Sequence, residues 1–411
     1  PPPSSDLAGA EPSVHPAGAW TTGPIGEVQD EFICFTIDPE LSADAWLDGL
    51  QVVPDNALVV HHVLVGLDRT GASEDIADDD GVYPCFGGFG NISDVAFIGA
   101  WVPGAAPITL PDHSALKVPA DARFVLQMHY HPLGEPAEAD ITTVDLKYTT
   151  ETPEWLSLIA LIGNFDNADS EGNGLEPGDD DSDGVEFRVP AGKGSHTEYM
   201  RFISPAMLNN VPNSEHHIYS VAPHMHYLGK RMAAWVDRPA ADAPLCPSEE
   251  ASPFSKCLSQ HCLSTDDLEA CIAENCASEF DNLSNLCEDC LTAYANVASP
   301  IAAFATCGAA PNWETKEQPA NECLFDSPQY DFEWQRLYQY DSPVEDLPVV
   351  RPGDTLRWLC EYDNTMTNQA VADALEYQGL SEPIDVYLGD TTLDEMCLLV
   401  LQTLYKPYSA E

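Results

Sequence analysis

Two histidines separated by one residue are the part of this sequence best suited to chemistry. His224 and His226 follow the apolar run 218–222, which predicts a β-strand. Because side chains alternate along a strand, both imidazoles are expected on one face. Neighbouring imidazoles repel each other when protonated and gain little when unligated, so two on one face favour a metal site. A single histidine in a strand would more often be structural.

Three further histidines could supply ligands. His61 and His62 lie in the run 57–65, which predicts a strand. Adjacent strand residues face opposite sides, so these two can share one ion only if the backbone twists there; otherwise one is a ligand and the other a core residue. His129 lies in the strand-like run 123–130 and could add a third imidazole if the two strands are neighbours.

The composition limits the classes of protein that need to be considered. The chain has 411 residues, and its 68 acidic and 16 basic residues give a formal net charge of −52. Such a charge argues against binding to nucleic acids or anionic membranes and suits a solvated acidic surface. No apolar run is long enough for a membrane-spanning helix. The 13 cysteines indicate an oxidising compartment, so we expect a secreted protein, extracellular or periplasmic.

Short apolar runs punctuated by Gly, Pro and Asp predict a mainly β protein built of antiparallel, jelly-roll-like β-sandwiches. The predicted strands cover residues 30–37, 57–65, 123–130, 141–148, 155–162, 218–222, 356–362 and 393–405. Residues 1–24 are rich in Pro, Ser, Ala and Gly and are expected to form a flexible leader. A Thr- and Pro-containing stretch then separates an N-terminal domain, 25–150, from a C-terminal domain, 151–411.

A Cys-rich segment at about 241–325 interrupts the second domain and holds nine cysteines. Residues 268–277 and 286–298 are predicted to be short helices. Four of the cysteines are spaced symmetrically about one turn, which favours a helical hairpin with nested disulfides 257–276 and 262–271, while other pairings remain open. Zinc is the weaker alternative for thiols in an oxidising setting. We expect a disulfide-stapled module that could contact a protein partner.

The acidic loop 164–184 resembles the beginning of a calcium-binding loop. Asp179, Asp181 and Asp183 have the spacing of the first EF-hand ligands, but the last ligand position holds Pro190. We therefore expect a solvated loop, with calcium as the alternative.

Four short motifs occur in one order along the chain and together resemble a known enzyme family. The motifs are His61-His62, Leu126-Gln127-Met128-His129-Tyr130, His224-Met225-His226-Tyr227-Leu228-Gly229-Lys230 and Asp394-Glu395-Met396-Cys397. In them the chain is similar to the copper type II, ascorbate-dependent monooxygenases, which include peptidylglycine α-hydroxylating monooxygenase and dopamine β-monooxygenase. The resemblance covers about residues 25–240 and 325–408, and it implies two antiparallel β-sandwich domains with one copper ion on each.

The resemblance also implies roles for individual residues. It implies an electron-donating copper held by His61, His62 and His129. It implies an oxygen-activating copper held by the catalytic residues His224, His226 and Met396. An all-imidazole set accommodates both copper oxidation states, whereas a thioether favours Cu(I). Without its motif, Met396 would more often be a core residue.

Other residues match family positions around the coppers. The matching disulfides are Cys34–Cys85 and Cys360–Cys397. They leave an odd number of cysteines in the insert, so one of these is free or intermolecular. Gln127 and His217 match positions near the copper sites, where they would contact the ligands.

The substrate pocket departs from the family pattern. Where the peptide-amidating enzymes have an Arg, an Asn and a Tyr, this chain has Ala222, Leu398 and Val400. Without those polar groups a substrate carboxylate would be buried without a partner, so a C-terminal glycine should be a poor substrate. The Cys-rich insert begins one strand after Lys230 and is expected to overhang the active site.

The resemblance therefore implies a secreted oxidoreductase with two copper ions per chain. It would hydroxylate an sp3 C–H bond of a small organic or peptide-derived substrate, with O2 and an external reductant such as ascorbate. The alternative is a non-catalytic copper-binding or carrier protein of the same fold. Neither function requires a nucleic acid or a membrane span.

Overall fold

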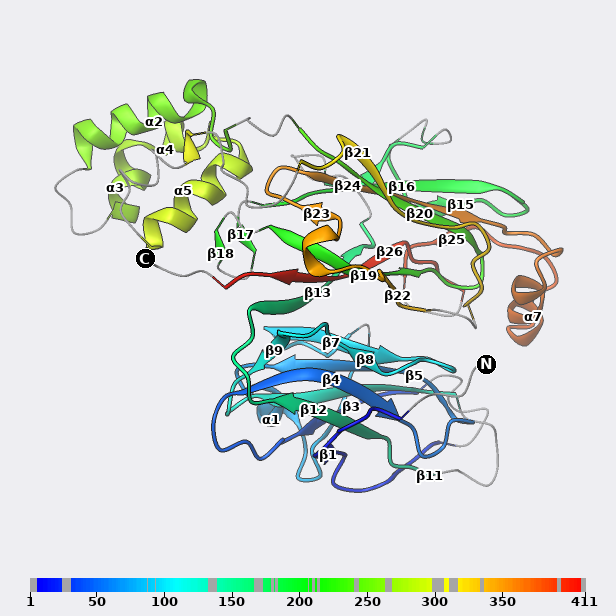
Figure 1. Ribbon diagram of the computed structural model, residues 1–411. Helices are drawn as coiled ribbons and strands as arrows, with labels where there is room; N and C mark the ends of the chain where they lie inside the picture. The colour runs from blue at the N-terminus through cyan, green and yellow to red at the C-terminus, as the bar shows by residue number, and fades with distance from the viewer. Residues whose placement is uncertain are drawn as a thin grey trace.

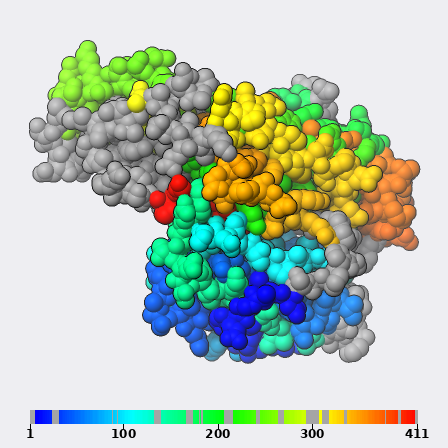
Figure 2. Space-filling model, in the orientation of Figure 1, coloured from blue at the N-terminus to red at the C-terminus, as the bar shows by residue number. Residues whose placement is uncertain are grey.

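The computed structural model has the mainly β fold that the sequence predicts, with two stacked domains and a helical module at one side (Figure 1; Figure 2). It describes residues 6–23, 31–86, 88–92, 94–131, 139–165, 173–178, 181, 184–205, 207–208, 211–212, 215–239, 244–262, 268–297, 307–309, 317–332, 336–389 and 393–407. No helix among these residues is long and apolar enough to cross a membrane.

The first domain is a sandwich of two antiparallel sheets. One sheet has the order β6 (Val82–Pro84), β3 (Glu31–Ile37), β10 (Arg123–Tyr130), β5 (Val60–Asp68) and β7 (Val95–Trp101). The facing strands are β1 (Ser13–Val14), β12 (Thr143–Thr149), β4 (Ala45–Val53) and β9 (Ser114–Val118), with β8 (Ile108–Thr109) beside β4. Phe124, Leu126 and Met128 alternate along β10 and point into the core between the sheets.

The second domain is also a sandwich. One of its sheets contains β13 (Trp155–Gly163), β26 (Leu398–Tyr405), β19 (His216–His224), β22 (Tyr338–Gln339) and β23 (Val349–Val350). The other has the order β14 (Gly174–Glu176), β16 (His196–Ile203), β24 (Thr355–Tyr362), β20 (Gly229–Asp237) and β21 (Asn321–Ser327). β24 buries every second side chain, as expected for a strand with one face on a core.

The two domains have separate cores but share one sheet. The first core draws on residues 14–148 and the second on residues 162–401. β9 of the first domain pairs in parallel with β13 of the second, through Ser114 with Trp155 and Ala115 with Leu156. This pairing joins one sheet of each sandwich into a ten-stranded sheet. The shared sheet therefore sets how the two domains face each other.

The prediction of a flexible leader at residues 1–24 is wrong for the part that the structure describes. β1 pairs with β12, and β2 (Trp20–Thr21) pairs with β11 (Ala139–Asp140). Leu7 and Val14 are buried, and the Leu7 amide donates to Gln51 Oε1 at 2.6 Å. A few apolar side chains at strand spacing are enough to attach a Pro-rich segment to an existing sheet edge, because β-pairing supplies the remaining interactions.

The Cys-rich insert forms a helical module. Its helices are α2 (Ser248–His261), α3 (Leu268–Asn275), α4 (Ala277–Phe280) and α5 (Asn285–Val297). The nested disulfides Cys257–Cys276 and Cys262–Cys271 are confirmed, and Cys246–Cys287 and Cys290–Cys307 accompany them. Cys34–Cys85 and Cys360–Cys397 are also present. Six disulfides fit an oxidising compartment, and Cys323 is the cysteine left outside them.

The module does not overhang the segment that carries His224 and His226. It leaves the sheet at the end of β20 and returns at the start of β21, whereas His226 lies just before β20 begins. The segment instead lies near α7 (Gln369–Tyr377), since Asn368 Nδ2 donates to the Tyr227 carbonyl at 3.0 Å. Figure 1 shows α7 on the opposite side of the second domain from α2–α5. Since the nine residues of β20 carry the chain about 30 Å away from the His226 turn, the insert lies at the other end of the sheet.

Candidate metal centres

A β-bulge brings His61 and His62 to the same side of the first domain. His129 on β10 pairs with His62 on β5, but the next residue, Tyr130, pairs with Val60. His61 is therefore the extra residue of a bulge, which turns its side chain out of the regular alternation. This is the backbone irregularity that a shared site requires of two adjacent histidines.

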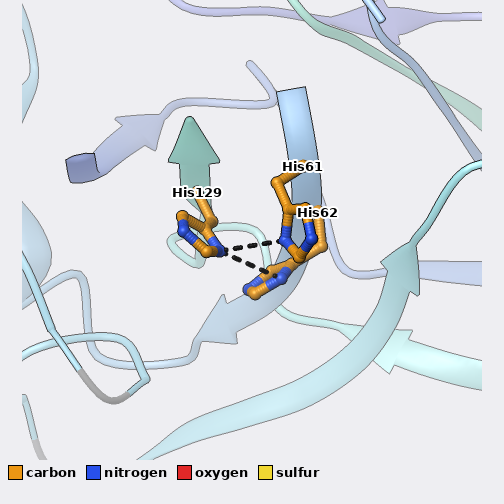
Figure 3. Close-up of side chains that lie close together, drawn as sticks. All are labelled: His61, His62 and His129. Atoms are coloured by element: carbon orange, nitrogen blue, oxygen red, sulfur yellow. Dashed lines mark hydrogen bonds between the residues drawn. The ribbon is translucent and has the colours of Figure 1, made fainter. Parts of the chain in front are cut away.

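The three imidazoles converge, as Figure 3 shows. His129 Nδ1 lies 3.2 Å from His61 Nδ1 and 3.3 Å from His62 Nδ1. Three nitrogens that bind one ion through bonds of about 2.0 Å lie roughly 3.3–3.5 Å apart, so the Nδ1 atoms have the spacing of a ligand set. Among the described residues, these three histidines are the group of His, Cys, Asp or Glu side chains whose ligand atoms lie close enough together to hold one ion.

The surroundings of His62 favour its neutral form. Burial, followed by the nearby imidazoles of His129, His61, His224 and His226, lowers the pKa of His62 well below its ordinary value. Phe32 stacks on His129 with ring centroids 4.2 Å apart. Neutral imidazole is the form that binds metal ions. The environment of His62 therefore fits the copper ion that the resemblance implies.

Gln127 lies two residues before His129, on the same face of β10. Its Nε2 donates to the Gly88 carbonyl at 2.6 Å. Its Oε1 is buried and has no hydrogen-bond partner among the described residues. A buried acceptor without a partner is unfavourable by about 1–3 kcal/mol. The role of Gln127 in supporting the metal centre stays a prediction.

The second group of histidines lies where β19 ends. The rings of His224 and His226 have centroids 5.5 Å apart and are nearly perpendicular, while Met225 between them is fully buried. His226 Nδ1 donates to the Asp394 carbonyl at 2.9 Å. Because a carbonyl can only accept, this bond places the proton on Nδ1 and leaves the Nε2 lone pair for a metal ion.

The Met396 segment is attached beside this pair. Leu398, two residues after Met396, pairs with His224 across β19 and β26. The Met396 carbonyl accepts from Tyr362 Oη at 2.7 Å, and the Cys397 amide donates to Asn164 Oδ1 at 3.0 Å. Met396 itself is half-buried. Its backbone is therefore fixed by bonds that do not involve the thioether.

Glu395 lies in the same segment and is completely buried. Its carboxylate accepts hydrogen bonds from the amides of His226 and Leu228, both at 2.8 Å. Burial raises the pKa of Glu395 to about 8, although the amide hydrogen bonds oppose this shift.

A single phenylalanine ring lies between the two histidine groups. The ring of Phe332 stacks on His61 of the first domain at 5.6 Å and meets His226 of the second edge-on at 6.0 Å. Tyr227 also contacts it at 4.6 Å. The two groups thus face each other across one aromatic side chain.

Tyr330 fixes the chain that carries Phe332. Its amide donates to the Lys230 carbonyl at 2.8 Å, and its hydroxyl bonds the backbone of Met225. A Cβ atom at Gly229 would lie 2.8 Å from the Tyr330 ring, which explains why the motif has glycine there. Sequence inspection missed both Tyr330 and Phe332, because neither belongs to a motif and both follow the insert.

The predicted pocket residues are cross-strand neighbours of His224. Ala222 pairs with Val400, and His224 pairs with Leu398. Strand alternation turns these side chains away from the second core, which takes Leu399 and Leu401 instead. The surface beside His224 is therefore apolar and supplies no partner from these positions for a substrate carboxylate.

The prediction that His217 supports a metal centre is wrong. His217 lies at the opposite end of β19 from His224. Its Nδ1 donates to the Val344 carbonyl at 2.8 Å, and its ring meets Trp155 at 4.7 Å. A match of residue type within a strand does not fix its distance from the site, since each intervening residue adds about 3.3 Å.

Of the three predicted calcium ligands in the acidic loop, the structure describes Asp181. Asp179 and Asp183 lie outside the described residues. Asp181 accepts hydrogen bonds from the amides of Gly178 and Glu186.

His216 is buried outside the two candidate metal centres, and we expect it to lower the stability of the fold in acid. His216 bonds Thr403 and stacks on Tyr405, and its pKa is lowered to about 3, mainly by burial and further by His217. The unfolded chain takes up a proton at this position near pH 6.5, whereas the folded chain does not, so stability falls as the pH drops below that value.

We expect His216 to contribute about 1 kcal/mol of lost stability between pH 7.5 and 5.5. Urea unfolding of the metal-free wild type and of His216→Gln at the two pH values measures this contribution. The variant should lose less stability than the wild type, and an equal loss in both would contradict the prediction.

Comparisons with known proteins do not identify a family. No family model matches the chain, and no curated protein matches it. Among solved structures, the major capsid protein P2 from bacteriophage PM2 is similar to 93% of this chain and 99% of its own, with 9% identity and a TM-score of 0.22. A similarity this weak carries no argument about fold or function.

Proposed function

We propose that this chain is a copper-dependent monooxygenase that hydroxylates an sp3 C–H bond of a small organic or peptide-derived substrate. The observation that carries the proposal is the convergence of three histidine Nδ1 atoms on one side of Phe332, with the His224–His226 pair on the other. Two separate ligand sets that face each other are what a two-centre electron-transfer reaction needs. Their donors, imidazole and thioether, are ligands that copper accepts in both oxidation states or as Cu(I).

The chain's own residues would hold two copper ions and would leave one coordination position open at the second centre. His61, His62 and His129 offer three imidazoles whose ring nitrogens lie close enough together to bind one ion. His224, His226 and Met396 would offer two imidazoles and one thioether, a set with room for a further ligand. Copper, when bound, supplies one-electron redox chemistry and binds O2.

The external reductant must deliver two electrons per turnover. Hydroxylation of one C–H bond consumes one O2, two electrons and two protons, and yields the alcohol and one water. Ascorbate or an equivalent reductant would supply these electrons. Because there are two facing metal centres, each centre could hold one of the two electrons before the reaction starts.

The surroundings of His224 set the substrate class. Ala222, Leu398 and Val400 make an apolar surface beside the His224 ring. An uncharged substrate, for example one with a benzylic C–H bond, would therefore be favoured over a peptide with a free C-terminal glycine. Phe332 contacts one histidine of each group, so a substrate bound between the groups would have to stack against this ring or replace it. Both features favour a small molecule.

A non-catalytic copper carrier is the second candidate. Phe332 also favours this reading, because an aromatic ring between the centres leaves less space for a substrate. Oxygen uptake coupled to ascorbate oxidation, measured on a panel of small aromatic and aliphatic compounds, separates the two functions. A carrier would show no uptake that depends on the added compound.

Copper stoichiometry tests the metal centres directly. The metal-free protein, loaded with copper and desalted, is expected to retain two ions per chain. His224→Ala should retain one, because it removes a ligand from the second centre and leaves the first intact. His261→Ala, which changes an exposed histidine of the helical module, is the matched control and should retain two. Fewer than two ions in the wild type would contradict the proposal.

A further inference from the structure

The Glu395 carboxylate joins the two segments that carry the candidate ligands of the second centre. Its Oε2 accepts from the His226 amide at 2.8 Å and from the Met396 amide at 3.1 Å. Its Oε1 accepts from the Leu228 amide at 2.8 Å. The carboxylate is completely buried, so these bonds are not in competition with water.

These hydrogen bonds fix the parts of the chain that a metal ion needs at one spacing. His226 and Leu228 belong to the turn between β19 and β20, whereas Met396 lies before β26. The neighbouring Asp394 carbonyl accepts from His226 Nδ1 at 2.9 Å and so sets the rotation of that ring. The position and orientation of the His226 imidazole therefore depend on the segment that carries the thioether.

A carboxylate is the group suited to this arrangement. In its ionised form, which the three amide hydrogen bonds favour and burial opposes, its two oxygens accept all three amide protons and present no donor. Glutamine has the same shape, but its side chain ends in one oxygen and one NH2 group. The NH2 group would face a backbone N–H and leave that N–H without an acceptor in a buried site. Aspartate keeps the charge but is one methylene shorter, so it cannot reach both segments in the same way.

We propose that Glu395 is a positioning residue that sets the spacing of His226 and Met396 and thereby the metal affinity of the second centre. The inference rests on the proposed function, because it assumes that these residues hold copper. Glu395 bonds the backbone amides of His226 and Met396, so it acts through the backbone of the candidate ligands and not through their metal-binding atoms. Partners of this kind typically change metal affinity about 10–100-fold.

The test compares Cu(I) binding by the wild type and by Glu395→Gln, using competition with a chromophoric chelator. We expect the variant to hold one ion as tightly as the wild type and the other at least about tenfold more weakly. X-ray absorption of the Cu(I)-loaded proteins provides the second readout. The sulfur contribution from Met396 should fall in the variant while the imidazole contribution remains, which general destabilisation would not produce.

Glu198→Gln is the matched control. Glu198 is a buried carboxylate of the same domain that bonds His196 Nε2 at 2.8 Å and the Arg188 amide at 3.2 Å. Its loss should lower stability and leave both ions bound. Glu395→Asp provides a second variant in case the glutamine protein does not fold, and the same selective weakening is expected.

The outcomes separate the two proposals. If the wild type binds two ions and both Glu395 variants keep the wild-type affinity and sulfur signal, the inference is wrong and the proposed function stands. If the wild type binds fewer than two, the proposed function is wrong and the inference falls with it. Equal weakening of both ions in Glu395→Gln would also overturn the inference, because it would mark a general loss of structure.

Discussion

Replacing Met396 by isoleucine is expected to abolish oxygen uptake coupled to ascorbate oxidation while the protein remains folded. The thioether would be the soft ligand of the second centre, and isoleucine retains its bulk but offers no lone pair. Loss of an outer partner of a ligand already lowers activity roughly 10–100-fold, so loss of the ligand itself should exceed that range.

The fold should tolerate this change. Met396 is half-buried, and its segment is held through backbone atoms by Tyr362, Asn164 and Glu395 and through the Cys360–Cys397 disulfide. A volume-conserving apolar replacement usually costs less than about 1.5 kcal/mol. An oxygen electrode measures turnover, and urea unfolding measures stability.

Met366→Ile is the control for the Met396 prediction. Met366 is 46% exposed, so the same chemical change there should alter neither turnover nor stability. Activity that survives in Met396→Ile would show that the thioether has no part in the reaction.

Replacing Gly163 by alanine is expected to lower the free energy of unfolding by about 3 kcal/mol or more. Gly163 ends β13 with φ near +131°, and a Cβ atom there would lie 2.1 Å from the Cys397 carbonyl oxygen. That carbonyl cannot move freely, because it accepts from Trp358 Nε1 at 3.2 Å and Cys397 is in a disulfide. The added methyl group must therefore displace the segment that carries Met396.

Gly184→Ala separates backbone strain from this clash. Gly184 has φ near +149° but nothing within 4 Å of its Cβ position, so alanine should cost about 1–2 kcal/mol there. Urea unfolding of both variants measures the difference. Equal destabilisation would mean that the contact with Cys397 does not matter. Copper analysis of Gly163→Ala should also show a weaker second centre.

Local patterns were sufficient for the features that depend on neighbours in sequence. The His224–His226 pair is predicted to face one way because strand alternation is a local rule, and the two rings do lie side by side. The nested disulfides of the insert follow from symmetric cysteine spacing, and both are present. The motif around Met396 anticipates a disulfide at Cys397, which is also present.

Features that depend on distant contacts were missed or misplaced. The predicted leader is attached to the first domain, because β12 and β11 offer strand edges that no local pattern reveals. His217 matches a family position yet lies at the far end of its strand. α7 was not predicted; the helix is only nine residues long, and its Val371 and Leu375 are buried against the second core.

Residue chemistry and periods of a few residues were enough to predict the candidate ligand types, their order, the β fold and the favoured cysteine pairing around one turn of the insert. Three features of the candidate centres come from long-range packing: the bulge at His61 beside His62 and His129, the place of Phe332 between the two histidine groups, and the hydrogen bonds by which Glu395 joins the segments of His226 and Met396. These three depend on strand register and on contacts between distant parts of the chain, with a separation of 67 residues for His62 with His129 and 169 for His226 with Glu395. Register is fixed by the packing of whole sheets and not by any short segment.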